Sequence, residues 1–238
     1  MIDFHSHILP EMDDGSDSVA MSLEMLRESR RQGVDLICAT SHFYADEEDP
    51  ASFLACRNEA YAELLDAMGE NDDAYPRILL GAEVLYFPGM SGAEELRGLR
   101  LQETPFLLIE PPMMPWSEMM LDEIESCGRT LNCIPVIAHL DRYQRFLQDN
   151  TLFDRVKDRR VLVQVNASYF LHRSTREDAL RKLREDRFHF IGSDCHDLSG
   201  RRPNLGEAVR IIREAGADTQ AAWEVNLARQ NRAMHMDW

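Results

Sequence analysis

Two short stretches place residues that can bind metal two positions apart. One reads His5-Ser6-His7 near the N-terminus, and the other reads Asp194-Cys195-His196. Side chains two residues apart on a β-strand point to the same side, so each pair can direct two ligands at one ion. A single histidine at a strand end is more often a hydrogen-bonded rim residue than a ligand, but two such pairs are hard to explain by coincidence. We therefore expect a metal site.

Further candidate ligands end other apolar runs, namely His42, Glu83, Glu110 and His139. Asn166 also ends such a run but is a poor ligand, and His189 and His235 are not predicted to bind metal. Neutral imidazoles mixed with hard carboxylates suit Mn, Fe or Zn better than Ca or Mg. Carboxylates can bridge, and two ions about 3.5–4 Å apart could hold a hydroxide for an in-line displacement. The expected chemistry is metal-dependent hydrolysis, with phosphate esters as the favoured substrate class.

The elements that must position these residues are seven runs with strand character, separated by helical patterns. The runs are Ile2–His7, Asp35–His42, Arg77–Val84, Phe106–Glu110, Ile134–His139, Val161–Asn166 and Phe188–Asp194. Most are continuously apolar, as parallel strands buried on both faces are. Seven strand–helix units without an obvious linker predict one barrel of parallel strands over residues 1–238, with a doubly wound open sheet as the alternative. The carboxyl ends of barrel strands form one rim, where active sites lie.

Capping residues indicate where several helices begin or end. Asp17 or Ser18 can start the first helix, which Gly33 follows, and Asp49-Pro50 pairs an N-cap with proline at the first helical position. Ser174–Glu177 has the spacing of a capping box. Helical periodicity also covers Trp116–Thr130, Thr151–Arg159, Leu205–Ala215 and Thr219–Gln230.

Composition excludes some classes of protein. The 238 residues are 44% hydrophobic, and the net charge of −16 argues against nucleic-acid binding, which needs clustered Lys and Arg. The longest apolar runs are too short to span a membrane, and the N-terminus lacks the pattern of a secretory signal. The five cysteines form no CxxC pair. Reduced thiols, and hence a cytoplasmic location, are the expectation.

Taken together, these motifs are similar to those of a known family. His5–Pro10 with Asp13-Asp14-Gly15 closely resembles the opening of the polymerase-and-histidinol-phosphatase (PHP) superfamily. More narrowly, the chain resembles the bacterial manganese-dependent protein tyrosine phosphatases of capsule and exopolysaccharide operons. The resemblance continues through Ala39–His42, Gly81–Glu83, Leu108–Glu110, Ala138–Tyr143 and Gly192–His196, and Arg201 and Pro203 complete it.

The resemblance implies a distorted, TIM-like barrel of seven strands that holds three ions, with Mn²⁺ as the metal and Fe or Zn as alternatives. Carried over by position, the ligands of the first ion are His5, His7, Glu83 and Asp194. Glu83 would bridge to a second ion, which Glu110 and His139 also bind. The third would take His42, His196 and Asp14, although Asp13 could exchange roles with Asp14, which could instead cap the following helix. Phe43 and Asp197 stand where many members carry histidine and asparagine.

Two arginines follow candidate metal histidines on the same rim, and both are predicted on loops where the chain leaves the barrel. Arg142 comes three residues after His139, and Arg201 five after His196. A guanidinium there can bind two phosphate oxygens at once, which favours phosphate binding over a salt bridge of Arg142 with Asp141 or a solvated Arg201. Cys195 and Arg201 also form the C-x5-R pattern of cysteine-based tyrosine phosphatases. Neighbouring carboxylates would raise the pKa of the Cys195 thiol, so we interpret it as a packed core residue.

The resemblance implies phosphotyrosine on a protein as the substrate, with the tyrosine-rich tail of a bacterial autophosphorylating kinase as the partner. A small-molecule phosphatase, such as one acting on histidinol phosphate, is an alternative with nearly the same metal site. An amidohydrolase is another, but many of these use a carboxylated lysine, and this chain has only Lys157 and Lys182, both in helical stretches. A non-catalytic module with a structural metal is the third, and the complete set of ligands argues against it.

Overall fold

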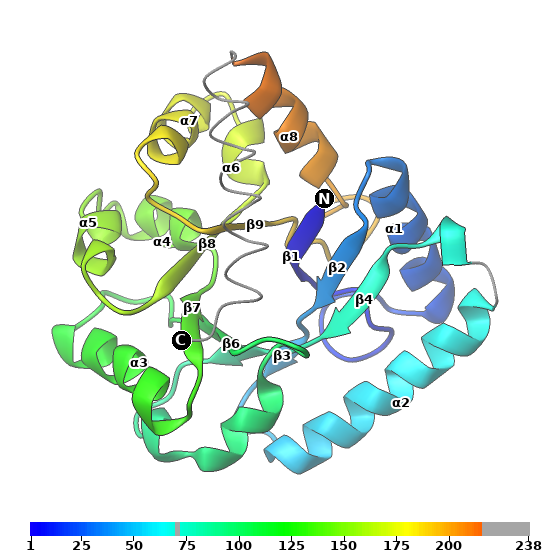
Figure 1. Cartoon of the computed structure of the whole chain (residues 1–238), viewed down its shortest axis with the longest axis horizontal. Helices are drawn as coiled ribbons and strands as arrows, with labels where there is room; N and C mark the ends of the chain where they lie inside the picture. Colours follow the sequence, from blue (N-terminus) through cyan, green and yellow to red (C-terminus); the bar gives the residue numbers. More distant parts are fainter. Residues whose placement is uncertain (70–71, 216–238) are drawn as a thin grey trace.

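The computed structural model describes residues 1–69 and 72–215 (Figure 1), so the predicted helix Thr219–Gln230 and His235 lie outside the described residues. The strands in this part of the chain are β1 (Ile2–Ser6), β2 (Leu36–Ala39), β3 (His42–Phe43), β4 (Arg77–Leu80), β5 (Glu83–Leu85), β6 (Phe106–Glu110), β7 (Ile134–Ile137), β8 (Leu162–Asn166) and β9 (Phe190–Gly192). Each coincides with a predicted run. Two runs are interrupted, one between β2 and β3 and the other between β4 and β5.

The strands form a curled, all-parallel sheet whose two ends meet. One part has the order β1-β2-β4, and the other has the order β3-β5-β6-β7-β8-β9. The interrupted runs connect these parts, because β3 follows β2 directly and β5 follows β4. At the closure, His7 N donates to Cys195 O at 2.9 Å and Asp194 N donates to His5 O at 2.8 Å. The prediction of a distorted seven-strand barrel is therefore confirmed, and the doubly wound open sheet was the wrong alternative.

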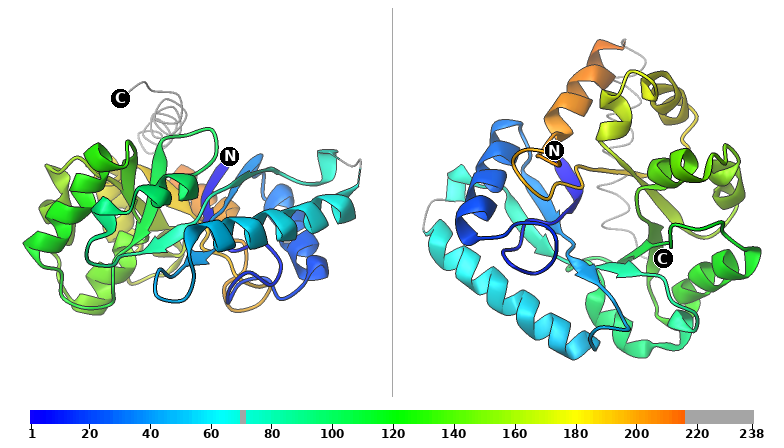
Figure 2. Two further views of the ribbon diagram at one scale, coloured as in Figure 1. Left: turned by 90° about the horizontal axis from the view of Figure 1, so that it is seen from below. Right: turned by 180° about the vertical axis from the view of Figure 1, so that it is seen from behind.

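Helices surround the strands on the outside, as Figures 1 and 2 show from three directions. They are α1 (Val19–Arg31), α2 (Pro50–Met68), α3 (Glu118–Thr130), α4 (Leu140–Leu147), α5 (Leu152–Lys157), α6 (Ser168–Leu171), α7 (Arg176–Arg184) and α8 (Leu205–Glu214), with short 3-10 segments at Asp72–Ala74, Met90–Gly92 and Glu94–Leu99. Within the described residues, no helix is both long and apolar enough to cross a membrane.

Most of the predicted helix boundaries agree with the structure. Ser18 caps α1 by accepting from Met21 N, and Asp49 caps α2 by accepting from Ala51 N and Ser52 N. The capping box at Ser174–Glu177 was wrong. The helix begins one residue later, with Thr175 at the cap position, and the Thr175 hydroxyl donates to Tyr169 O at 2.7 Å instead of capping.

The interior of the barrel is filled with apolar side chains below the polar rim. The rings of Phe4 and Phe190 stack with centroids 3.8 Å apart, and Phe106 meets both edge-on. Leu101, from the segment before β6, packs into the same cluster. The stacked rings make the barrel a solid support and not a channel, so the rim is reached from one side only.

The close approach of β1 and β9 depends on a glycine and a buried carboxylate. A Cβ on Gly192 would lie 2.5 Å from His5 Cβ, so any side chain there would push the strands apart. Asp3 is almost fully buried, and its Oδ1 accepts from Ser193 N at 2.7 Å. We call this junction, where β1 and Ser193–His196 meet, the closure seam. It brings the first and last predicted metal pairs together.

Candidate metal centre

The predicted ligands converge around one carboxylate, Glu83, whose side chain is 1% exposed. Glu83 Oε2 lies 3.1 Å from His5 Nε2, 3.3 Å from His7 Nε2 and 3.2 Å from His42 Nδ1. Its other oxygen, Oε1, lies 2.7 Å from His139 Nε2. The four histidines come from β1, β3 and the end of β7. A single carboxylate thus faces imidazoles on both of its oxygens, as a bridging ligand must.

The remaining predicted ligands extend this centre in two directions. Glu110 lies beside His42 and His139, at 3.6 Å and 3.5 Å. Asp194 Oδ1 lies 3.8 Å from His5 Nε2 on the seam side. Three groups of side chains in the described residues have donor atoms close enough to share an ion: His5, His7 and Glu83; His42, Glu83 and Glu110; and His7, Asp14, His42 and His196. His42 belongs to two of these groups, whereas the resemblance implies it for the third ion alone.

Asp13 and Asp14 have different surroundings. Asp13 Oδ2 lies 2.7 Å from His7 Nδ1 and also accepts from His42 N, while its Oδ1 accepts from Gly15 N. Asp14 is exposed, and its Oδ1 lies 3.2 Å from His196 Nε2. Asp13 therefore orients His7 by holding its outer nitrogen, whereas the exposed Asp14 faces His196 and, at 3.7 Å, Arg201 Nη1.

Sequence analysis missed two residues that orient the ligands, Gln164 and Asn166. Gln164 Oε1 accepts from His139 N at 2.6 Å and lies 3.3 Å from His5 Nδ1. Asn166 Nδ2 donates to Asp194 Oδ2 at 2.8 Å. Both are buried on β8, two positions apart and thus on one face. That spacing within an otherwise apolar strand was the signal that could have identified them.

Two predicted ligands sit on unusual backbone. His139 has φ 31°, and Asp194 has φ 53°, both in the left-handed region that non-glycine residues seldom adopt. Each lies two residues beyond the end of its strand, β7 or β9, so the turn directs its side chain back over the barrel. Such conformations persist where the surroundings hold them, and they cluster at functional sites.

The electrostatics and unpaired atoms of the cluster fit a bound cation. Burial raises the pKa of Glu110 to about 7, and the nearby Glu83 charge adds to this. Burial lowers the pKa of His196 to about 4 and also lowers that of His42, which keeps both rings neutral. His42 Nδ1 and His196 Nε2 are buried without a hydrogen-bond partner among the described residues. Neutral imidazoles with unused nitrogens beside crowded carboxylates match a divalent-metal donor set.

His7 has a raised pKa, as His139 does, in contrast to His42 and His196. Burial alone would lower the pKa of His7, but its hydrogen bonds to Asp13 and Glu83 outweigh burial and raise that pKa to about 10. A proton on His7 would block its inner nitrogen. A cation at that nitrogen would replace the proton while keeping the contact with Asp13, so metal binding at this position would release a proton.

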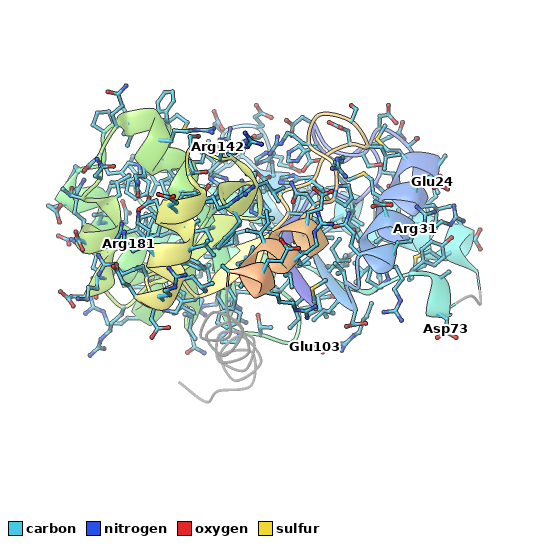
Figure 3. The ribbon with its side chains drawn as sticks, turned by 90° about the horizontal axis from the view of Figure 1, so that it is seen from above. Glu24, Arg31, Asp73, Glu103, Arg142 and Arg181 are labelled. Atoms are coloured by element: carbon cyan, nitrogen blue, oxygen red, sulfur yellow. The ribbon has the colours of Figure 1, made fainter. Side chains whose placement is uncertain are left out.

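The two predicted arginines lie beside the cluster, one of them in an unexpected element. Arg142 was predicted on a loop, but it lies in the first turn of α4, which begins directly after His139. Figure 3 shows Arg142 on the edge of the molecule opposite Glu103, a residue that precedes β6. Arg201 lies on the loop after β9, where its Nη2 donates to Asp194 Oδ1 at 2.7 Å. Both arginines and Asp194 line one cavity.

The two departures from the family pattern now have structural explanations. Phe43 is fully buried and packs edge-on against Phe53 of α2. A histidine at this position would place a polar ring in the apolar core. Asp197 accepts from Ser199 N and Arg201 N, and it thereby shapes the loop that carries Arg201. Neither side chain is among the three metal-binding groups of the described residues.

Cys195 is fully buried in the main apolar core, as predicted. Burial raises the pKa of its thiol far above the usual range, with Asp3 and Asp194 contributing. A thiolate nucleophile is therefore disfavoured at this position.

We expect Cys195→Ser to keep its turnover within about twofold of wild type, because the sulfur is not needed for a metal-based reaction. The measurement is the initial rate on a phosphotyrosine peptide with saturating Mn²⁺, together with metal content. Iodoacetamide-treated wild type serves as the second arm and should lose little activity. Complete loss of turnover in the serine variant with full metal content would contradict the metal-based mechanism.

Comparisons with known proteins agree with the geometry. Residues 1–232 match the family model described as capsular polysaccharide synthesis, CpsB/CapC. The tyrosine-protein phosphatase CpsB of Streptococcus agalactiae is 32% identical over 230 residues, covering 89% of each chain. The tyrosine-protein phosphatase YwqE of Bacillus subtilis is 28% identical, covering 92% of this chain and 86% of its own.

A solved structure has the same fold over almost the whole length. It comes from work on YwqE of Bacillus subtilis and CpsB of Streptococcus pneumoniae, described as unique metal-dependent tyrosine phosphatases. The TM-score is 0.79 at 25% identity, and the match covers 97% of this chain and 94% of the other.

Proposed function

Because the chain belongs to the CpsB/CapC family of capsular polysaccharide synthesis proteins, we propose that it is a metal-dependent phosphatase that hydrolyses phosphotyrosine on proteins. The observation that carries this proposal is the convergence of four imidazoles on the two oxygens of Glu83, with further carboxylates and two arginines at the same rim. We also propose that residues 1–238 form one domain. The five cysteines are free, which agrees with a cytoplasmic location.

We assign the metal ligands as three sets around Glu83. His5, His7, Glu83 and Asp194 form the first; Glu83, Glu110 and His139 the second; and Asp14, His42 and His196 the third. Three ions, with Mn²⁺ favoured over Fe or Zn, agree with this donor chemistry. When bound, they supply Lewis-acid stabilisation of the phosphoryl oxygens and lower the pKa of the attacking water. The orientation of the metal ligands is fixed by hydrogen bonds from Asp13, Gln164 and Asn166.

In the proposed mechanism, Arg142 and Arg201 would bind phosphoryl oxygens of the substrate from the cavity that both line. Arg201 pairs with Asp194, and its side chain is 37% exposed, so it can turn part of its guanidinium toward a substrate. Burial raises the pKa of Glu110, and the charge of nearby Arg142 opposes that rise. A phenolate leaves easily, since its conjugate acid has a pKa near 10, and so it needs little help from an acid.

We expect Arg142→Lys and Arg201→Lys each to slow turnover by about thirty- to a hundredfold, because lysine loses the planar fork that grips two oxygens, at a cost of roughly 2–3 kcal/mol. Metal content and melting temperature should stay close to wild type, and inorganic phosphate should inhibit more weakly. Arg173→Lys is the matched control, since Arg173 is exposed and lines no part of this cavity. An early-melting variant with normal kinetics would identify that arginine as structural.

The positions of the two lysines among the described residues argue against the amidohydrolase alternative. Lys182 is buried in α7, where its ammonium donates to Asp178 Oδ2 at 2.6 Å and to Gln144 Oε1 at 2.7 Å. Lys157 lines a different cavity, on the side of Pro105 and Ile134 at the amino ends of the strands. Neither can supply a carboxylated bridge, and Glu83 occupies the central position.

We further propose that the substrate is the phosphorylated tail of a bacterial tyrosine kinase that regulates capsular or exopolysaccharide synthesis. The family description, capsular polysaccharide synthesis, supports this partner. The test compares Mn²⁺-loaded protein on four substrates: a phosphotyrosine peptide, a phosphoserine peptide, histidinol phosphate and p-nitrophenyl phosphate. We expect the phosphotyrosine peptide to have the highest kcat/KM. Preference for histidinol phosphate would replace the proposal with the small-molecule alternative.

A further inference from the structure

A cavity of about 290 Å³ opens beside the metal centre, between α4, α6 and the loop after β9. Asp194 and Arg201 are among its lining residues, and so it is continuous with the candidate site. Its walls also include Arg142 and Arg145 from α4 and His172 from the end of α6. Neither Arg145 nor His172 belongs to the metal centre or to the phosphate contacts assigned above.

The charge of this cavity contrasts with the rest of the protein. The chain carries a net charge of −16, yet three arginines and a histidine share one small cavity. Among the described residues, neither Arg142 nor Arg145 has a carboxylate within salt-bridge distance, although many other arginines of the structure are paired. Two cationic side chains are therefore available for an anion from outside.

Two carboxylates also line the cavity, and both have other partners. Asp194 pairs with Arg201 and is an assigned metal ligand. Asp141 is buried, and its Oδ1 accepts from Asn166 N at 2.9 Å. Neither carboxylate lies within salt-bridge distance of Arg145 among the described residues, so neither holds the Arg145 guanidinium in place.

The position of Arg145 separates it from the reacting phosphate. Arg142 is half-buried in the first turn of α4, beside His139, whereas Arg145 is exposed in the last turn. Three residues advance a helix by about 4.5 Å, so Arg145 lies further from His139 than Arg142 does, along the same face. His172 is also exposed, on the α6 wall. Because Arg142 and Arg201 are assigned to the reacting phosphoryl group, Arg145 and His172 remain for another part of the substrate.

We propose that Arg145 and His172 form an anion-binding subsite that takes an acidic side chain next to the phosphotyrosine in the substrate. This inference rests on the proposed function, because it places the phosphotyrosine beside Arg142 and Arg201 in the cavity. A carboxylate of Asp or Glu and the phosphate of a second modified residue share the required chemistry. The guanidinium of Arg145 supplies the charge, and the ring of His172 supplies an N–H donor from the opposite wall.

The test uses three phosphotyrosine peptides that differ only in the neighbouring residue: glutamine, glutamate or a second phosphotyrosine. Steady-state kinetics with Mn²⁺-loaded enzyme at fixed ionic strength give kcat and KM for each. For wild type we expect the two anionic peptides to have a KM about five- to tenfold below that of the glutamine peptide, as one or two charge-assisted contacts would give. A larger effect with the phosphate than with glutamate would identify a second phosphorylated residue as the natural ligand.

The variants separate a subsite from a general charge effect. Arg145→Gln and the double variant with His172→Asn should bring the KM ratio of anionic to neutral peptide close to one, with kcat nearly unchanged. Arg173→Gln removes the same charge from an exposed position outside the cavity and should keep the wild-type ratio. Persistence of the preference in the double variant, or an equal loss in Arg173→Gln, would overturn the proposal.

A binding measurement keeps the subsite testable if the proposed activity fails. Fluorescence anisotropy with labelled forms of the glutamine and glutamate peptides reports affinity without turnover. If no phosphotyrosine peptide is hydrolysed but the glutamate peptide still binds more tightly in an Arg145-dependent way, the proposed function is wrong and the subsite stands. If wild type bound both peptides with equal affinity, the proposed subsite would be wrong, whether or not the protein hydrolyses phosphotyrosine.

Discussion

Replacement of Glu83 by glutamine is expected to lower turnover on a phosphotyrosine peptide by about a thousandfold, because the loss of one shared buried charge costs roughly 4 kcal/mol. Glu83 is the only carboxylate among the described residues whose two oxygens face four imidazoles, those of His5, His7, His42 and His139. Glutamine keeps the shape but offers a neutral oxygen and an NH₂ group that repels a cation. The affinity for metal would therefore fall at two ion positions together.

Elemental analysis of the purified Glu83→Gln variant should therefore show the loss of more than one bound ion per chain. Glu63→Gln is the matched control, since Glu63 is exposed on α2 and has no ion pair among the described residues. The control should match wild type in metal content, rate and melting temperature. Near-normal metal occupancy and turnover in Glu83→Gln would show that the bridging assignment is wrong.

Removal of metal by prolonged chelation is expected to reduce activity by more than about a hundredfold, since no described side chain can replace the Lewis acid. Added Mn²⁺ should restore the rate. Protein dialysed in parallel without chelator controls for loss by handling. Activity that survives chelation to below one ion per ten chains, measured by elemental analysis, would exclude the metal-based reaction.

Stability should follow the metal in the same experiment. The ions bind the folded cluster and not the unfolded chain, so saturation at a thousand times the dissociation constant adds about 4 kcal/mol to the free energy of unfolding. The melting temperature should therefore rise with Mn²⁺ concentration in wild type. It should respond much less in Glu83→Gln, which separates specific binding from a general effect of salt.

The strand order and the rim were predictable because buried parallel strands leave continuous apolar runs that end in polar residues. All seven runs contain strands of the structure. The breaks after β2 and β4 were not predicted, since they depend on which neighbour each half-strand pairs with. Helix α4 was missed because it starts straight from the left-handed His139, without a side-chain cap. That omission placed Arg142 on a loop.

Within the site, the sequence predicted which residue types could bind metal, but not which of them face an ion and which orient another side chain. Asp13 and Asp14 are adjacent and chemically identical, and only their contacts in three dimensions distinguish them. Gln164 acts through a backbone N–H of His139 and a ring nitrogen of His5, two partners that are remote in sequence. Such supporting contacts depend on the barrel closing, which a local pattern does not encode.

The closure seam has a consequence for how the protein acquires activity. His5 and Asp194 become neighbours only when β9 settles against β1, with Gly192 against His5. Contacts between residues so distant in the chain carry the largest entropic cost of loop closure, and they form late in folding. During synthesis, the first two histidines leave the ribosome long before their partners. If the assigned ligands are correct, we therefore expect ion capture by the complete cluster to be a terminal event of maturation, so that catalytic turnover would report closure of the β1–β9 seam.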